Sequence, residues 1–156
     1  MAGKVKAIPD GYGSITPYLV VNEAAGAIEF YKKAFGATEI MRMDAPGGKI
    51  GHAEIRIGDS VVMLADEHPD FGAHAPQRYG GTPVSLLLYV EDVDKVVKGA
   101  VDLGSKLQRP VQDQFYGDRS GTIFDPFGHQ WTIATHKEDV TPEEMEKRMA
   151  ALAAQK

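Results

Sequence analysis

Three polar side chains alternate along one short stretch in the first half of the chain. His52, Glu54 and Arg56 occupy every second position of the segment HAEIR. Side chains two residues apart on a strand project to the same side, so an imidazole and a carboxylate would lie together. Such a pair suits a metal site or acid–base catalysis. The same alternation is typical of the wet face of a strand, with Glu54 and Arg56 as a solvated ion pair, and the sequence leaves both interpretations open.

A second cluster with chemical potential lies in the segment DQFYGDRSG, residues 113–121. Phe115, Tyr116 and Arg119 flank a glycine there, in an expected turn between strands. An aromatic–arginine group at the mouth of a cavity would clamp a planar or anionic ligand. The alternative is structural, with Arg119 anchoring the loop through Asp113 or Asp118.

The composition excludes several kinds of chemistry. The chain of 156 residues contains no cysteine, which rules out disulfides, thiol catalysis and thiolate metal sites. Its 17 basic and 22 acidic residues give a net charge of −5, which disfavours nucleic-acid binding but leaves room for a small anionic ligand. No apolar run approaches the ~20 residues that cross a bilayer, and no apolar stretch follows the N-terminal lysines. We expect a cytoplasmic protein with no nucleic-acid or membrane partner.

The elements that would position these residues form two similar series. Residues 14–22 read as a strand, and the next segment has Ala24, Ala27, Ile28, Tyr31 and Phe35 at helical spacing before Gly36. Three further strands are expected at 38–44, 49–58 and 60–67. The second half repeats this order, with a strand at 84–92, a helix at 93–104 and strands at 106–115, 119–125 and 129–136.

This internal repetition predicts a duplicated module. Each half is a βαβββ unit, and a curled four-stranded sheet with one helix leaves one face poorly covered. The predicted fold class is therefore α+β, with two modules forming curled sheets around a shared cavity and a C-terminal helix. The expected single domain, 1–156, consists of module one at about 14–67, a linker or flap at 68–83, module two at about 84–136 and a C-terminal helix at about 141–155.

The tail has the sequence features of a separate helix. Thr141 can cap it, Pro142 suits its first position, and Glu144 completes a capping box. Met145, Met149 and Leu152 then form a narrow apolar stripe that needs a surface to cover. We expect the helix to dock on its own domain or on a sister subunit, in a homodimer.

The quoted residues of both modules carry a resemblance to a known family. The segments YLVVNEAAGAIEFYKKAFGA, LYVEDVDKVVKGAVDLG and FDPFGHQWTI resemble the vicinal oxygen chelate superfamily. That superfamily includes glyoxalase I, bleomycin-resistance proteins, fosfomycin-resistance enzymes and extradiol dioxygenases. AIEFYKKAFGA and DPFGHQW are most similar to its 3-demethylubiquinone methyltransferase-like branch. The resemblance covers about residues 14–136 and implies the fold far more specifically than the chemistry.

The resemblance also implies where a divalent metal would be held. In metal-dependent members the ligands come from the first and last strands of each module, and the corresponding residues here are Thr16, Met63, Ser85 and Thr132. None of these is His, Asp or Glu. A neutral hydroxyl is a poor ligand for a divalent ion, and a thioether is soft and uncharged. We therefore expect a retained pocket without the metal, and no cofactor.

These residues lead to a hypothesis about function. The expected activity is glyoxalase/bleomycin-resistance-like binding of a small, neutral or aromatic organic molecule, with the segment 68–83 closing over the entrance. The alternative is a metal-dependent lyase, isomerase or dioxygenase with a displaced site involving His52 and Glu54, so the sequence does not decide whether the protein is an enzyme. Some of the pocket residues would instead fill a closed core if the cavity were absent. The predicted ligand-binding residues are Thr16, Tyr18, Met63, Ser85, Tyr89, Phe115, Tyr116, Arg119, Gln130 and Thr132.

Overall fold

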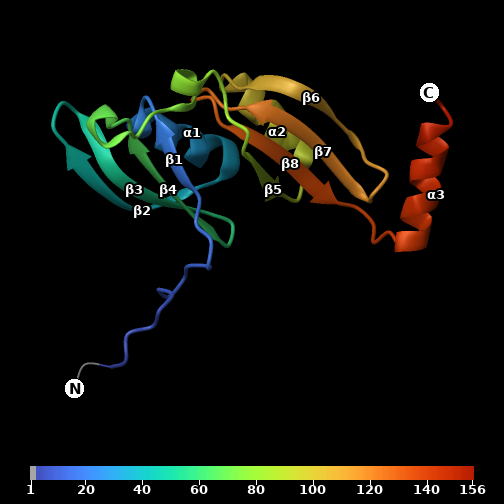
Figure 1. Cartoon of the computed structure of the whole chain (residues 1–156), viewed down its shortest axis with the longest axis horizontal. Coiled ribbons are helices and arrows are strands. Elements are labelled where there is room, and N and C mark those ends of the chain that lie inside the picture. Colours follow the sequence, from blue (N-terminus) through green and yellow to red (C-terminus); the bar gives the residue numbers. More distant parts are fainter. Residues whose placement is uncertain (1–2) are drawn as a thin grey trace. The chain divides into compact units, whose positions relative to one another are not determined.

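The computed structural model describes residues 3–156, which divide into two compact units. The first unit is Met1–Gly81 and the second is Thr82–Lys156. Each unit contains one four-stranded sheet and a helix that packs on it (Figure 1). The α+β class and the repeated βαβββ order expected from the sequence are confirmed. The cavity expected between the modules stays a prediction.

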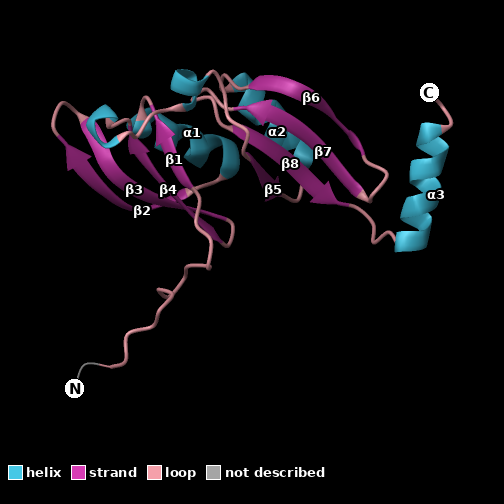
Figure 2. Ribbon diagram, in the orientation of Figure 1, coloured by secondary structure: helices cyan, strands magenta, loops and turns pink. Residues whose placement is uncertain are grey.

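The sheet of the first unit has the strand order β1-β4-β3-β2. β1 runs parallel to β4, and the other neighbouring strands are antiparallel (Figure 2). The crossover helix α1 makes the parallel pairing possible, because parallel neighbours need a long connection. The elements of this sheet are β1 (Tyr18–Val21), α1 (Ala24–Phe35), β2 (Thr38–Ala45), β3 (Lys49–Ile57) and β4 (Ser60–Asp66).

α1 covers one face of this sheet. Its buried residues recur at the spacing that the sequence predicted, with Ala27, Ile28 and Tyr31 fully enclosed. They pack against the strand residues that point the same way, such as Ile55 and Leu64, which are also fully buried. The helix ends at Gly36, whose φ of 67° is left-handed and whose N–H bonds to the carbonyl of Lys32.

The segment expected to be a linker or flap is ordered within the first unit. It contains two short 3-10 helices, η1 (Pro69–Phe71) and η2 (Pro76–Tyr79). The Glu67 carboxylate accepts a bond from the Ala75 N–H at 2.7 Å, and the Asn22 amide donates to Gln77 at 3.2 Å. The division between the units falls after Gly81, within the range 68–83 expected for the linker.

The second unit repeats the arrangement with the strand order β5-β8-β7-β6. β5 is parallel to β8, and the Asp92 carboxylate caps the first turn of the crossover helix by accepting from the Lys95 N–H. Val93, Val97 and Ala100 are buried on the inner side of this helix, against the sheet. The elements are β5 (Ser85–Tyr89), α2 (Val93–Asp102), β6 (Lys106–Asp113), β7 (Asp118–Phe124) and β8 (Gln130–His136).

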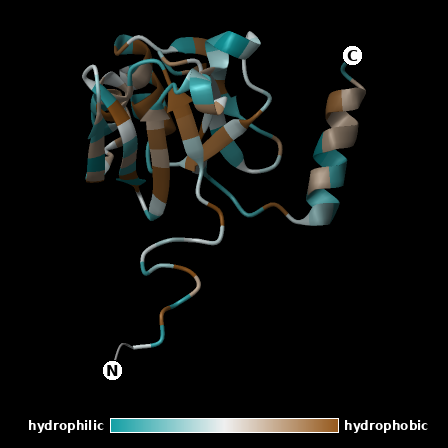
Figure 3. Ribbon diagram, turned by 60° about the vertical axis from the view of Figure 1, so that its left-hand side comes forward, coloured by the Kyte–Doolittle hydropathy of each residue, from teal (hydrophilic) through white to brown (hydrophobic). Residues whose placement is uncertain are grey.

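The C-terminal helix α3 (Pro142–Ala153) begins as the sequence predicted. The Thr141 hydroxyl accepts a bond from the Glu144 N–H at 3.2 Å. The helix carries hydrophobic and hydrophilic residues along its length (Figure 3), and none of its residues is buried. Arg148 connects it to the turn before β7 by donating to the carbonyl oxygen of Phe115. No helix among residues 3–156 has the length and hydrophobicity needed to span a membrane.

Candidate functional site

The face of each sheet opposite its helix carries the candidate residues. In the first unit, strand pairing places Tyr18 beside Met63, Met63 beside Glu54, and Glu54 beside Met41. Because alternate residues share a face, His52 lies on the same side of β3 as Glu54. We call this surface the open face of the first module.

A hydrogen-bonded series crosses that open face. The hydroxyl of Tyr12, in the segment before β1, donates to one oxygen of Glu54, and His52 Nε2 lies 3.0 Å from the other. His52 Nδ1 then lies 2.9 Å from the hydroxyl of Tyr18. The series Tyr12–Glu54–His52–Tyr18 therefore joins the N-terminal segment, β3 and β1. The ion pair between Glu54 and Arg56 that the alternation allowed is replaced by these bonds, and the Arg56 guanidinium bonds to the carbonyl oxygen of Gly11.

The electrostatics of this series fix its direction. The bonds donated by Tyr12 and His52 lower the pKa of Glu54, so its carboxylate is an acceptor at neutral pH. His52 must then donate from Nε2, and in the neutral imidazole Nδ1 is left as the acceptor. Burial, followed by the charge of Glu54, raises the pKa of Tyr18, which keeps its phenol protonated and able to donate to Nδ1. Tyr18 thus presents its oxygen lone pairs to whatever occupies the open face.

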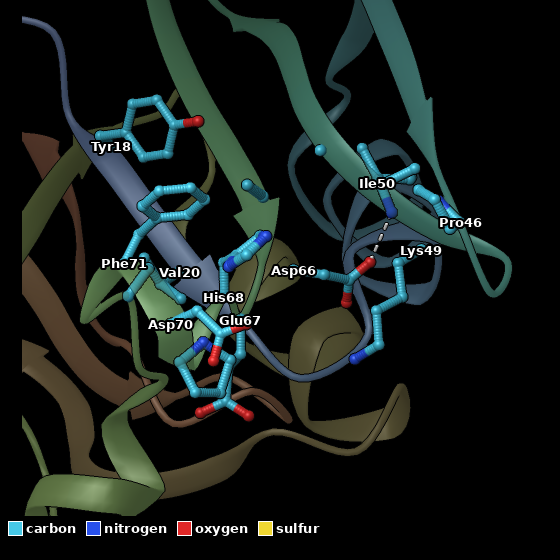
Figure 4. Close-up of a pocket in the computed structure, with 15 residues that line it drawn as sticks. Tyr18, Val20, Pro46, Lys49, Ile50, Asp66, Glu67, His68, Asp70 and Phe71 are labelled. Atoms are coloured by element: carbon cyan, nitrogen blue, oxygen red, sulfur yellow. Dashed lines mark hydrogen bonds between the residues drawn. The ribbon is translucent and has the colours of Figure 1, made fainter.

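A pocket adjoins Tyr18 within the first unit. It has a volume of about 620 Å³ and is lined by Tyr18 and Val20 of β1, residues of β3 and β4, and the segment around η1 (Figure 4). The rings of His68 and Phe71 lie 4.4 Å apart between centroids and belong to this wall. Three rings of π character make the pocket suitable for a planar organic molecule.

Two carboxylates at the pocket have structural roles. Asp66, which is mostly buried, accepts a bond from the backbone N–H of Ala24 at 3.0 Å and another from that of Ile50 at 2.7 Å, the second of which is drawn in Figure 4. Glu67 accepts from the backbone of Ala75 at 2.7 Å. These bonds hold α1, β3 and the segment after β4 around the pocket.

The open face of the second module carries a row of hydroxyls. Strand pairing aligns Leu87, Thr132, Thr122 and Arg109 across β5, β8, β7 and β6. The hydroxyl oxygens of Ser85 and Thr132 lie 3.4 Å apart, and those of Thr132 and Thr122 lie 3.1 Å apart. Arg109 donates to Thr122 from Nε at 3.2 Å and from Nη2 at 2.9 Å.

A second polar group lies at the end of the same sheet. The Tyr89 hydroxyl donates to Asp118 at 2.8 Å, and His136 lies between Asp118 at 2.7 Å and Asp139 at 2.8 Å. The two carboxylates, with Asp139 as the stronger influence, raise the pKa of His136. The bond to Asp118 raises the pKa of Tyr89. Tyr89 is therefore a neutral phenol, held in place by a buried carboxylate.

The structure brings some of the predicted ligand-binding residues together and separates others. Tyr18 pairs with Met63, and Ser85 contacts Thr132 and pairs with Gln130. Thr16 lies before β1 and is half-buried. Phe115 and Tyr116 form an edge-to-face pair in the turn between β6 and β7, with centroids 5.3 Å apart.

Arg119 has a different environment from the one expected of a ligand clamp. It pairs with Thr135 on the helix-covered side of the sheet and binds both oxygens of Asp94 of α2, at 2.8 and 2.9 Å. A further bond joins it to Asp113 at 3.2 Å. Arg119 thus makes the bond to Asp113 that the structural alternative named, whereas Asp118 bonds to Tyr89 and His136, and the role of Arg119 in ligand binding stays a prediction. Arg119 and Tyr89 project from opposite faces of the sheet.

Two residues of these networks were missed in the sequence. Arg109 is one of three polar residues that precede the proline in the stretch KLQRPVQDQ, and nothing in the spacing marks it as facing Thr122. Tyr12 lies outside any predicted strand, 42 positions from Glu54. Asp118 was considered only as an anchor for Arg119. A signal that could have identified Asp118 is the expected pairing of its strand with the strand that ends at His136.

Two βαβββ modules with the same strand order define this chain as a duplicated-module protein. The profile of the Glyoxalase/Bleomycin resistance protein/Dioxygenase superfamily matches residues 12–133, and the chain belongs to this superfamily. The resemblance drawn from the sequence is thereby confirmed.

Similar proteins show the same relationship. An uncharacterized protein of Mycobacterium tuberculosis is 40% identical over 141 residues, which are 88% of this chain and 83% of the relative. The crystal structure of TioX from Micromonospora sp. ML1 has a TM-score of 0.63 and 25% identity, and covers 80% of this chain and 98% of TioX. The PhnB protein of Bacillus cereus, named after 3-demethylubiquinone-9 3-methyltransferase, shares the fold, with a TM-score of 0.62, 18% identity and coverage of 79% and 99%.

The residues at the four superfamily metal positions do not fit a divalent ion. In the second module, Ser85 and Thr132 bond to each other, and Thr122 connects them to the guanidinium of Arg109. Neutral hydroxyls are poor ligands, and the nearby guanidinium charge would repel a second cation. In the first module, Met63 offers only a soft thioether. No group of three or more His, Cys, Asp or Glu side chains suited to a metal occurs within residues 3–156.

Proposed function

We propose that this protein binds a small organic molecule, planar or aromatic in character, without a divalent metal at Thr16, Met63, Ser85 and Thr132. The observation that carries the proposal is the pocket of the first module, where the ring of Tyr18 lies with those of His68 and Phe71 in a volume of about 620 Å³. Aromatic walls supply stacking, and the Tyr18 oxygen supplies a fixed polar contact.

The test of this proposal is a titration by calorimetry with a panel of neutral aromatic compounds, after metal analysis of untagged protein. We expect binding without added metal, and a loss of about tenfold in affinity for Tyr18→Ala or Phe71→Ala, since each removes a stacking surface. Tyr79→Ala is the matched control, because Tyr79 is exposed and does not line the pocket. Stoichiometric metal at the four positions, or equal binding by all variants, would refute the proposal.

A second candidate is acid–base catalysis at His52. It is favoured by the bonds that orient His52 between Glu54 and Tyr18, an arrangement that positions a base against a proton donor. Its test is proton NMR of a bound compound in deuterated water. Exchange of a carbon-bound proton in wild type, lost in His52→Gln with binding retained, would assign an isomerase or lyase. Metal bound at His52 and Glu54 would instead support a metal-dependent lyase, isomerase or dioxygenase.

A further inference from the structure

A cation faces the open side of the second module because β6 is irregular. Leu107 pairs with Ile123, but Arg109, two residues on, pairs with Thr122, the next residue back along β7. The extra residue, Gln108, is a bulge. In a regular strand, Gln108 would oppose Thr122 and Arg109 would project from the other face, because a shift of one residue exchanges the two faces of a strand. The bulge therefore places the guanidinium of Arg109 against the row of hydroxyls.

The direction of the hydrogen bonds is fixed at the Arg109 end of this row. A guanidinium only donates, so Thr122 accepts from Arg109 and must use its own hydrogen toward Thr132. Thr132 can then donate to Ser85, whose own hydrogen remains for another partner. Each bond polarises the next in the same direction. The row thus begins with a cation at Arg109 and ends at the hydroxyl of Ser85.

The guanidinium is anchored but not neutralised. Thr122 is fully buried, and the two bonds to its oxygen fix the plane of Arg109. Both terminal nitrogens keep N–H groups for a further acceptor, a geometry that matches an oxyanion. Among residues 3–156, no salt bridge joins Arg109 to a carboxylate, whereas Arg119 and Arg148 each have two acidic partners.

We propose that the guanidinium of Arg109 forms an oxyanion-binding subsite on the open face of the second module, which takes the carboxylate or phosphonate-type group of an organic molecule. Leu87 and Tyr89, which are 53% and 58% exposed, offer an apolar and aromatic surface on the same face of the sheet, on β5, with β8 and β7 between them and Arg109. The subsite lies within the second module and stands independently of the pocket in the first.

The experiment uses the full chain and three probes of similar size, namely benzoate, phenylphosphonate and the neutral benzamide. Calorimetry is run on wild type, Arg109→Gln and Ser85→Ala, with Arg78→Gln as the control. Arg78 is an exposed arginine of η2, in the other unit. We expect at least one anion to bind more tightly than benzamide. Its affinity should fall about tenfold or more in Arg109→Gln, because the arginine supplies the charge-assisted bonds, and change little in Ser85→Ala, because Ser85 lies on the opposite edge strand.

The outcomes distinguish a carboxylate ligand from a phosphonate ligand, and they test this subsite separately from the pocket of the first module. Preference for benzoate assigns a carboxylate, and preference for phenylphosphonate assigns a phosphonate or phosphate group. Equal binding of benzamide and both anions, absence of anion binding, or unchanged affinity in Arg109→Gln would overturn the subsite. Loss of anion binding in Arg109→Gln alongside unchanged binding of neutral aromatic compounds supports it, and Tyr18→Ala separately tests the first-module pocket.

Arg109→Gln leaves Thr122 buried with one fewer donor, and its fold must be checked by circular dichroism and urea unfolding. The double variant Arg109→Met, Thr122→Val removes both partners, an exchange that is often nearly neutral for stability. It too should lose the preference for the anion. A folded double variant that still binds the anion as wild type does would refute the assignment of Arg109.

Discussion

At the scale of single residues, the first module depends on a carboxylate that is almost fully enclosed. Glu54 is only 7% exposed and both of its oxygens accept a bond, from Tyr12 and from His52. A buried carboxylate of this kind is tolerated when both of its oxygens accept hydrogen bonds. Removing the charge should therefore disturb both the stability of the module and the orientation of Tyr18.

We expect Glu54→Gln to lower the free energy of unfolding by about 1–3 kcal/mol at neutral pH, because an uncharged amide has one acceptor oxygen for the two donors Tyr12 and His52. Urea unfolding measures this, with Glu29→Gln as the control, since Glu29 is an exposed carboxylate that forms a surface ion pair with Lys32. Equal stabilities of the two variants would show that the buried network contributes little.

The pH dependence of the same carboxylate has a defined sign. Its pKa is lowered by the bonds from Tyr12 and His52, so its contribution is present above the ordinary pKa of 4.5 and is lost as pH falls through the folded value. The difference in stability between wild type and Glu54→Gln should therefore shrink below pH 4.5. A constant difference across the acid range would contradict this origin.

In the second module, the stability that His136 contributes changes with pH in the opposite direction. Asp139 and Asp118 raise its pKa, so the stability that it adds is present below the ordinary value of 6.5 and is lost as pH rises through the folded value. NMR titration should find a midpoint above 6.5 in wild type and a lower one in Asp139→Asn, which lacks the stronger partner. A midpoint unchanged by Asp139→Asn would assign the shift to another cause.

The residue scale is also where prediction from sequence was weakest. Alternation predicted that His52 and Glu54 share one face of a strand, and their side chains lie 3.0 Å apart. The family resemblance, rather than alternation, predicted that Ser85 and Thr132 come together, and their hydroxyl oxygens lie 3.4 Å apart. Alternation did not find Arg109, because a bulge in β6 changes which face each residue occupies. Tyr12 was missed because its contact with Glu54 is tertiary and leaves no local pattern.

At the scale of elements, sequence patterns predicted most of the secondary structure. The helical spacing of apolar residues located α1 and α2, and the capping residues located the start of α3 at Thr141. These signals are local, so they survive without knowledge of the tertiary fold. The two 3-10 helices of the segment after β4 were not predicted, since short turns around prolines lack a periodic signature.

Two glycines in the second module should respond oppositely to alanine. Gly99 lies inside α2 with open space at its Cβ position, so Gly99→Ala should stabilise by about 0.5–1 kcal/mol through helix propensity. Gly117 has a φ of 102°, and a Cβ there would overlap the Glu138 carbonyl oxygen. Gly117→Ala should therefore destabilise by about 2–4 kcal/mol. Urea unfolding of both variants tests the pair, and similar values would invalidate the assigned turn geometry.

At the scale of the whole molecule, the duplicated modules were predicted because both halves carry the same order of elements. The repetition is confirmed by two sheets whose strand orders match, β1-β4-β3-β2 and β5-β8-β7-β6. Self-association is much harder to predict from the sequence, because it depends on which apolar side chains remain exposed after folding. The stripe on α3 is one such set.

The last prediction concerns this stripe and a homodimer. Met149 and Leu152 are 53% and 49% exposed, and no residue of α3 is buried, so the helix retains an apolar surface for a second copy of the chain. We expect light scattering to give a dimer mass at micromolar concentration, and Met149→Glu with Leu152→Glu to shift it toward the monomer, because charges on the stripe would lose hydration on association. Ala150→Glu is the matched control, since this exposed residue lies away from the stripe on the same helix. A monomeric wild type would contradict the dimer, and a dimer unaffected by the double substitution would place the interface on another surface.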